Sequence, residues 1–266
     1  QVVRANYVDA AGNAASDGEV TDSAKLDTAG PAPIDPGNPI PVNPVDPVGP
    51  VPAGKTVLVV NPVTADGVLN AQEAQGNVQV TGKVYGEYQA NDVVTLVVNQ
   101  KTYTGQVAAD GSYSIAVAGA ELAVDGDKTI DASVVARDAA GNTATIGAKR
   151  TYTVDGTAPS NADMQLAVSI STDANNDAQV STSELNGAEN FSSRVSFDKS
   201  KAALGDQIVV SASNDGVALS AQTVTLDSTA LANGYVDVVF AKPAEGKSQV
   251  VRANYVDAAG NAASDG

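Results

Sequence analysis

The stretch QVVRANYVDAAGNAASDG occupies Gln1–Gly18 and recurs without a single change at Gln249–Gly266. Neither chance nor gradual divergence leaves an identity of that length, so it indicates a recent tandem duplication with a spacing of 248 residues. A unit of that size is long enough for two ordinary domains. We therefore expect the chain to be an excerpt from a longer array of repeats.

A second, weaker repeat lies inside this unit. VVARDAAGNTATIGAKRTYTVDGTAPS (Val134–Ser160) follows the order and spacing of Val3–Pro33: an alternating strand, the turn DAAGN, a second strand, and an Asp-Thr-Ala-like signal before proline. The turn occurs three times, at Asp9–Asn13, Asp138–Asn142 and Asp257–Asn261. We expect its Gly and Asn to supply the positive φ of a tight hairpin turn.

The composition predicts an all-β fold. The chain is 43% hydrophobic but only 4% aromatic, and short alternating runs are broken by Asn, Asp and Gly. No window sustains a helical period. One strand should place Ile130, Ala132, Val134 and Ala136 on a single face. The predicted strands are Val93–Asn99, Ser112–Gly119, Thr129–Arg137, Asp206–Ser213 and Gly234–Ala241. Short strands separated by frequent turn signals predict tandem β-sandwiches of about 100 residues each.

The recurring end signal sets the domain boundaries. Residues 1–29 correspond to the last strands of a preceding domain, 55–158 to a complete domain, and 159–266 to a second domain that lacks its last strand. By the repeat alignment the missing strand corresponds to Glu19–Asp27. This segment could complete the second domain by strand addition, within the chain or in a neighbouring chain. The alternative is a frayed tail.

Residues 30–54 are a proline-rich linker. The run PAPIDPGNPIPVNPVDPVGPVP (Pro31–Pro52) holds nine of the twelve prolines at intervals of two or three. Such a run favours an extended polyproline II rod of about 3.1 Å per residue, roughly 65–70 Å in all. The competing interpretation is a ligand for a proline-recognition domain, which the absence of flanking basic residues disfavours.

The charge narrows the choice of partners. A net charge of −16 argues against nucleic acid or an anionic membrane and favours cations. With no cysteine and no histidine, disulfides, zinc sites and nucleophilic machinery built on these residues are excluded. No apolar run approaches the 18 residues of a membrane span.

The most informative motif is DANNDAQVSTSE, Asp173–Glu184. Its oxygen-bearing side chains fall at positions 1, 3, 5, 9 and 12, which is the ligand order of an EF-hand loop; they belong to Asp173, Asn175, Asp177, Ser181 and Glu184. Two features depart from that pattern: Ala178 stands where a glycine is usual, and the flanks read as strands rather than helices. We predict a calcium site here, the alternative being a solvated polar turn.

The first domain carries a reduced version, TADGVLNAQE, in which Asp66 and Glu73 align with Asp177 and Glu184. A cation there needs ligands from elsewhere, such as Asp138 or Asp155. The aspartates of the DAAGN turns could equally cap backbone amides. Asp155 and Asp27 sit where one domain ends and the next begins, where a carboxylate could share a cation with the neighbouring domain or be an exposed linker acid.

The run Gly86–Pro159 contains NDVVTLVVN, the hairpin YTGQVAADGSYSIAVAG, ASVVARDAAGN and VDGTAP, in that order. With these motifs it resembles the bacterial Ig-like repeats of giant RTX adhesins. The second domain keeps the D-x-N-x-D…E loop, GDQIVVSAS and DAAGN, while its middle strands diverge. The likeness covers nearly everything outside the proline run, which departs from the short linkers usual in such arrays.

This resemblance implies an extender role. Tandem β-sandwiches rigidified by Ca²⁺ would project a distal ligand-binding domain from the surface of a Gram-negative cell after type I secretion, for adhesion or biofilm formation, with neighbouring repeats as partners. Carried over by position, the calcium ligands would be Asp66, Glu73, Asp138 and Asp155 in the first domain, and Asp173, Asn175, Asp177, Glu184 and Asp257 in the second.

Two other function classes were weighed against the extender. An enzyme would need paired carboxylates in a cleft, but the acids here cluster at turns, so we expect none. A glycan- or protein-binding Ig-like module is the alternative. It would usually need an exposed aromatic platform, whereas three Phe, eight Tyr and no Trp are few enough to be used mostly in the core.

Overall fold

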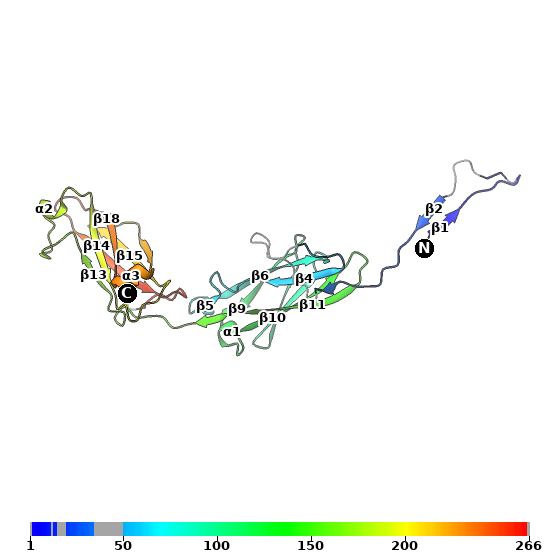
Figure 1. The fold of residues 1–266 in the computed structure, drawn as a ribbon, viewed down its shortest axis with the longest axis horizontal. Coiled ribbons are helices and arrows are strands. Elements are labelled where there is room, and N and C mark those ends of the chain that lie inside the picture. The colour runs from blue at the N-terminus through cyan, green and yellow to red at the C-terminus, as the bar shows by residue number, and fades with distance from the viewer. Residues whose placement is uncertain (1, 12, 15–19, 35–49, 265–266) are drawn as a thin grey trace.

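The computed structural model describes the chain except residues 1, 12, 15–19, 35–49 and 265–266. Its described parts follow one another along a single long axis (Figure 1). A two-stranded hairpin lies at one end, a first β-sandwich in the middle and a second β-sandwich at the other end. The predicted all-β fold with tandem sandwiches is confirmed.

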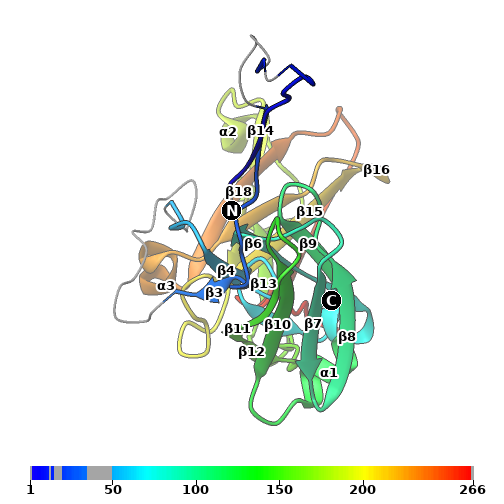
Figure 2. The same cartoon turned by 90° about the vertical axis from the view of Figure 1, so that its right-hand side faces the viewer.

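The first domain packs two four-stranded sheets against each other. One has the strand order β3-β4-β6-β9 and the other β11-β10-β7-β8, and the parallel pair β12-β5 closes one end. The bounds are β3 Ala32–Pro33, β4 Lys55–Val60, β5 Val68–Asn70, β6 Asn77–Gly86, β7 Val93–Val98, β8 Lys101–Gln106, β9 Ser112–Ala118, β10 Thr129–Arg137, β11 Thr143–Thr151 and β12 Thr153–Asp155. Figure 2 shows β11, β10, β7 and β8 side by side in that order.

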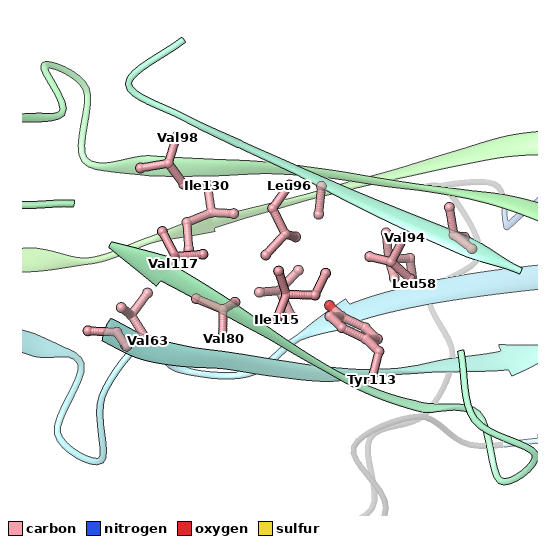
Figure 3. Close-up of a cluster of buried hydrophobic side chains, with 14 of the residues drawn as sticks. Leu58, Val63, Val80, Val94, Leu96, Val98, Tyr113, Ile115, Val117 and Ile130 are labelled. Carbon is pink, nitrogen blue, oxygen red and sulfur yellow. The ribbon is translucent and has the colours of Figure 1, made fainter. Parts of the chain in front are cut away.

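Buried and exposed side chains alternate along the strands, and the buried ones form the core of this domain. In β10 the predicted face is buried, with exposures of 0% at Ile130 and Val134 and 6% at Ala132. The side chains that face it come from β4, β6 and β9 of the other sheet, among them Leu58, Val80 and Ile115 (Figure 3). Each fully buried aliphatic side chain contributes about 1.5–3 kcal/mol. The core is therefore built from many medium-sized side chains and few aromatic ones.

Strand β3 lies within the range predicted as linker. Ala32–Pro33 pair in parallel with Lys55–Thr56 of β4, and Ala32 N donates to Gly54 O at 3.0 Å. The start of the proline-rich run is thus part of the first domain's sheet. Most of the predicted rod, residues 35–49, lies outside the described residues, so its polyproline II conformation stays a prediction.

The second domain repeats this design. One sheet has the order β13-β14-β18, and in the other β15 lies between β19 on one side and β17 with β16 on the other. The bounds are β13 Ala167–Ile170, β14 Asn190–Ser196, β15 Gln207–Asn214, β16 Val217–Ala218, β17 Gln222–Thr225, β18 Tyr235–Ala241 and β19 Gln249–Val256. Its core is led by Tyr255, Ile208 and Leu226, each at most 1% exposed.

Within the described residues, four helical turns interrupt the strands, although the hydrophobic pattern predicts none. They are η1 Glu73–Gln75, α1 Gly119–Val124, α2 Thr182–Leu185 and α3 Ser228–Asn233. Two of them, α2 and α3, carry capping signals: at the start of α3, for example, Asp227 accepts from Ala230 N at 2.8 Å, and Gly234 ends that helix at φ +76°. Among the described residues, no helix is long and apolar enough to cross a membrane.

The N-terminal hairpin consists of β1 Val2–Ala5 and β2 Val20–Ser23. Strand β1 is identical in sequence to part of β19, yet the two copies lie in different surroundings. Tyr7 is 74% exposed, whereas its counterpart Tyr255 is 1% exposed. Every residue of β1 is exposed. Among the described residues, Tyr7 thus lies in an exposed hairpin and Tyr255 in a domain core.

Candidate metal loop and domain junction

The loop DANNDAQVSTSE joins β13 to β14 at the end of the second domain far from the first (Figure 1). The carboxylate of Asp173 accepts hydrogen bonds from Asp177 N at 3.2 Å and from Ala178 N at 2.9 Å. Two backbone turns make this possible, because Asn176 and Ala178 adopt φ of +59° and +64°. Asp173 thus organises the first half of the loop around its own side chain.

Glu184 ties the two ends of the loop together. Its Oε1 accepts from Ala174 N at 3.1 Å and Asn175 N at 3.3 Å, and its Oε2 accepts from Ser181 N at 2.9 Å. Ser181 caps α2 in a reciprocal capping box with Glu184. The hydrogen bonds from Ser181 lower the pKa of Glu184. Glu184, at position twelve, therefore holds the end of the loop against Ala174 and Asn175 near its start.

The oxygen-bearing side chains of this loop suit a calcium ion by their type. Asp173, Asn175, Asp177 and Glu184 belong to one hydrogen-bonded loop, with Asn175 Nδ2 donating to Asp177 Oδ2 at 3.1 Å. The positive φ of Ala178 falls at position six, where an EF-hand loop makes its sharp turn and usually has glycine. Carboxylate and amide oxygens are the ligands that Ca²⁺ prefers. Within the described parts of the chain, however, no three Asp, Glu, His or Cys side chains are gathered closely enough to hold a metal.

The predicted ligands of the first domain are held in separate turns. Asp66 Oδ1 accepts from Thr64 Oγ1 at 2.8 Å and from Val68 N at 3.0 Å. Glu73 Oε2 accepts from Asn70 N at 3.0 Å, and Glu73 N donates to Asn70 Oδ1 at 2.9 Å. These contacts are those of turn-capping acids, and a calcium role for Asp66 and Glu73 stays a prediction.

The DAAGN turns share one internal clamp. Asp138 accepts from Asn142 N and from Asn142 Nδ2, both at 2.9 Å, and Asp257 accepts the corresponding bonds from Asn261. The side-chain bond from Asn142 lowers the pKa of Asp138. Gly141 has the predicted positive φ, +88°, but the expectation of positive φ at the asparagine is wrong, since neither Asn142 nor Asn261 adopts it. The asparagine is there as a hydrogen-bond donor.

Asn261 also joins the two domains. Its Nδ2 donates to Asp155 O at 2.9 Å, and its Oδ1 accepts from Ala71 N at 2.8 Å. Beside it, Asn70 Nδ2 donates to Ala259 O at 3.1 Å. Asn261 is only 4% exposed, so these bonds are shielded from water. The structure therefore brings Asp155 and Asp257 to the same asparagine at the junction.

The same contact recurs at the other end of the first domain. Asn142 Nδ2 donates to Asp27 O at 3.4 Å, just as Asn261 does to Asp155 O. Asp27 and Asp155 hold the same place in the repeat, each shortly before the Pro that follows Thr-Ala. In both cases the asparagine side chain of a domain's DAAGN turn donates a hydrogen bond to the main chain at the end of the segment that precedes that domain.

Sequence reasoning missed two buried aspartates that brace these turns. Asp92, 2% exposed, accepts from Arg137 N at 2.9 Å and from Arg137 Nε at 2.6 Å. Asp206, 5% exposed, accepts from Ala258 N at 2.9 Å and from the hydroxyl of Tyr255. The available signal was an Asp directly before a strand in both domains, in NDVV and GDQIVV. Asp92 thereby links Arg137, just before the first domain's DAAGN turn, to the start of β7. Asp206 likewise links Ala258, within the second domain's turn, to the start of β15.

Comparison with protein-family models gives no match, and comparison with curated proteins gives none. Solved structures do match. A bacterial immunoglobulin-like domain from the M. primoryensis ice-binding adhesin is 45% identical, over 37% of this chain and 95% of that one, with a TM-score of 0.35.

Two longer adhesin structures align with nearly the whole chain. A Ca²⁺-stabilised adhesin that helps an Antarctic bacterium reach out and bind ice is 27% identical, over 98% of this chain and 53% of that one, with a TM-score of 0.46. A structure concerned with the cell-surface retention of a 1.5-MDa bacterial ice-binding adhesin is 23% identical, over 97% and 68%, with a TM-score of 0.48. The identity of the first match extends across almost an entire domain, so the part of this chain that it covers belongs to the bacterial immunoglobulin-like domains of adhesins.

Proposed function

We propose that this chain is a structural extender of a bacterial cell-surface adhesin. Its sandwiches, stiffened by Ca²⁺, hold a distal ligand-binding domain away from the cell, for adhesion or biofilm formation. Its partners in this role are the neighbouring repeats of the same array. Export by type I secretion, as in RTX adhesins, belongs to the same proposal.

The observation that carries the proposal is the repeated junction. Asn261 binds Asp155 O and Ala71 N of the preceding domain, and Asn142 binds Asp27 O at the equivalent place. A joint encoded within the repeat is copied with every repeat, so each added unit extends the array in the same way. Repeated copying of the unit therefore makes the array longer, which is what an extender requires.

The aromatic residues favour this role over a ligand-binding module. Of the three Phe and eight Tyr, only Tyr7 is exposed, and the other ten are buried or half-buried. A glycan-binding surface usually offers an aromatic platform. In the proposed role the chain has no enzymatic activity of its own and stands outside the cell.

Calcium would act through the loop whose donors fit it. Asp173, Asn175, Asp177 and Glu184 would hold one ion, and Asp155 and Asp257 are the acids best placed to hold another at the junction; Asp66, Glu73 and Asp138 remain further candidates. Extracellular modules bind Ca²⁺ with Kd of about 10⁻⁴–10⁻³ M. At a concentration of about 100 Kd, each ion stabilises the folded state by about 2.7 kcal/mol.

Thermal unfolding in EDTA, in MgCl₂ and in CaCl₂ at matched ionic strength tests the calcium part. A stabilisation of that size raises the Tm of a domain of about 100 residues by roughly 10 °C. We expect this rise in calcium and little change in magnesium. Melting curves that superimpose in all three conditions would contradict it.

A pair of variants locates the effect. Glu184→Gln removes the charge that closes the loop, and we expect it to abolish the calcium-dependent rise of the second domain's transition. Glu245→Gln removes a charge from an exposed acid outside the loop and should leave the rise intact. If both variants showed the same calcium-dependent rise in Tm, the ion would not be bound by Asp173–Glu184.

A further inference from the structure

Strand β3 and the start of β4 hold the two ends of the proline-rich run at one place (Figure 2). Ala32 pairs with Lys55, and Ala32 N donates to Gly54 O at 3.0 Å. The side chain of Lys55 donates to Pro33 O at 3.1 Å. Because paired strands lie about 4.8 Å apart, the chain that leaves β3 returns to within one strand spacing of it before the first domain continues.

The chain between these two anchors is long. Twenty-three residue steps separate Ala32 from Lys55, and at about 3.3–3.6 Å per residue they extend to roughly 80 Å. While β3 is paired, almost none of this length lies between the segment before the first domain and the domain itself. Separation of β3 from β4 would add about 75 Å between them.

The attachment of β3 is specific but small. The N–H of Ala32 is the only main-chain donor that β3 has, because Pro33 has no N–H. Just before β3, Pro31 is buried, and Gly30 packs so closely that a Cβ there would lie 2.7 Å from Thr143 O. These contacts keep β3 in place at rest. Few hydrogen bonds have to break to release it.

The strands that follow are held more firmly. Strand β4 pairs with β6 over five residues and buries Leu58 and Val60, which are 5% and 6% exposed. At the other end of the domain, β12 pairs with β5 over three residues, and Asn261 adds its bonds to Asp155 O and Ala71 N. Elements with few buried contacts open at the lowest free energy. A pull on the two ends of the chain therefore releases β3 before it disrupts the core.

We propose that the proline-rich run is a reserve of hidden length, which becomes extended when tension separates β3 from β4 and before the first domain unfolds. The proposal rests on the extender role, since a chain that joins a cell to a bound ligand carries tension. Opening of β3 lengthens the array while both sandwiches stay folded. When the tension falls, Gly30–Pro33 can return to the same positions on β4 and β11.

Single-molecule stretching of the whole chain, held by enzymatically ligated tags at its two ends, tests this proposal. We expect an early step of about 75 Å in contour length. Unfolding of Lys55–Asp155 should follow at higher force and release roughly 300 Å. The β1–β2 hairpin opens in a small step of its own, so two variants identify the step that belongs to β3.

A disulfide between β3 and β4 is the first variant. The chain has no cysteine, and Ala32→Cys with Lys55→Cys places two thiols on paired residues, whose Cα separation of about 4.8 Å a disulfide accepts. We expect the oxidised variant to lose the step of about 75 Å and to regain it on reduction. The step of the hairpin should remain in both states. An early step of about 75 Å that persists in the cross-linked chain would overturn the proposal.

A shortened run is the second variant. Deletion of residues 39–46 removes eight residues and leaves both anchors intact, so the early step should shrink by about 25–30 Å. The unfolding step of the first domain should not change. A wild-type chain without the early step, or a deletion variant with a step of unchanged length, would contradict hidden length. Either result would leave the extender role standing, because that role depends on the junction at Asn261 and is tested separately.

Discussion

The side-chain amide of Asn261 donates a 2.9 Å hydrogen bond to the main-chain oxygen of Asp155, joining the DAAGN turn of the second domain to the last strand of the first. The same amide donates to the carboxylate of Asp257 at 3.0 Å, which holds it in place. Asn142 makes a longer contact, 3.4 Å, with Asp27 O at the equivalent place, so this one contact of the joint recurs in the repeat. The asparagine of DAAGN is thus both a turn-forming and a domain-joining residue.

Replacing Asn261 should loosen the junction and destabilise the second domain. Asn261→Ala removes bonds to Asp155, Ala71 and Asp257 from a site that is 4% exposed. Leaving buried polar groups without partners costs about 1–3 kcal/mol. We expect a lower midpoint of the second domain's transition in urea, and a broader distribution of end-to-end distances by small-angle X-ray scattering.

Asn13→Ala is the control for this variant. Asn13 lies in the identical turn and makes the same bonds to Asp9, from its N and its Nδ2, both at 2.9 Å, but it is exposed. We expect its effect on the urea midpoint to stay within about 0.5 kcal/mol. If Asn13→Ala and Asn261→Ala were equally harmful, the clamp within the turn, and not the junction, would account for the loss.

Much of the fold could be predicted because period-two alternation and turn residues are local signals. The strands predicted at Val93–Asn99, Ser112–Gly119, Thr129–Arg137, Asp206–Ser213 and Gly234–Ala241 are confirmed to within one residue at each end. The helical turns escaped prediction because they are at most six residues long, too short to show a helical period. Helix α2 could have been found from its capping box, Ser181 with Glu184.

The domain junction could not be predicted, because it depends on contacts between residues far apart in the sequence. Asn70 and Ala259 are 189 positions apart, and Asn142 and Asp27 are 115 apart. Sequence identity also hides differences in surroundings. Tyr7 and Tyr255 lie in the same eighteen-residue stretch, and only the presence of β15 beside one of them decides which is buried.

Ala178→Gly should stabilise the second domain. Ala178 adopts φ of +64°, a left-handed conformation that costs a residue with a Cβ about 1–2 kcal/mol. Glycine removes this strain but loses about 0.5–1 kcal/mol through the greater freedom of the unfolded chain. The net gain should be about 0.5–1 kcal/mol, measured by urea unfolding in EDTA. Ala174→Gly, in the same loop without positive φ, should be neutral or destabilising; a gain there of equal size would rule out strain at Ala178.

Tyr255→Phe should destabilise the second domain, whereas Tyr7→Phe should not. The hydroxyl of Tyr255 donates to the buried carboxylate of Asp206, which also braces Ala258 N at 2.9 Å. Removing a donor from a buried charged acceptor costs about 2 kcal/mol. Tyr7, at 74% exposure, should tolerate the change within about 0.5 kcal/mol. The comparison by chemical denaturation would fail if both variants matched the wild type.

Stability should fall at alkaline pH. Burial raises the pKa of Tyr113, Tyr152 and Tyr255 well above the ordinary value of 10.0, and hydrogen bonds to Asp125 and Asp206 reinforce the rise at Tyr152 and Tyr255. The folded state therefore keeps these protons where the unfolded chain releases them. Their contribution is complete below about pH 10 and is lost progressively as the pH rises toward the folded-state pKa values. Urea midpoints measured from pH 8 to 11.5 should decline above pH 10, and Tyr255→Phe should weaken that decline while Tyr7→Phe leaves it unchanged. A midpoint that stays constant through this range would show that the tyrosines titrate alike in both states.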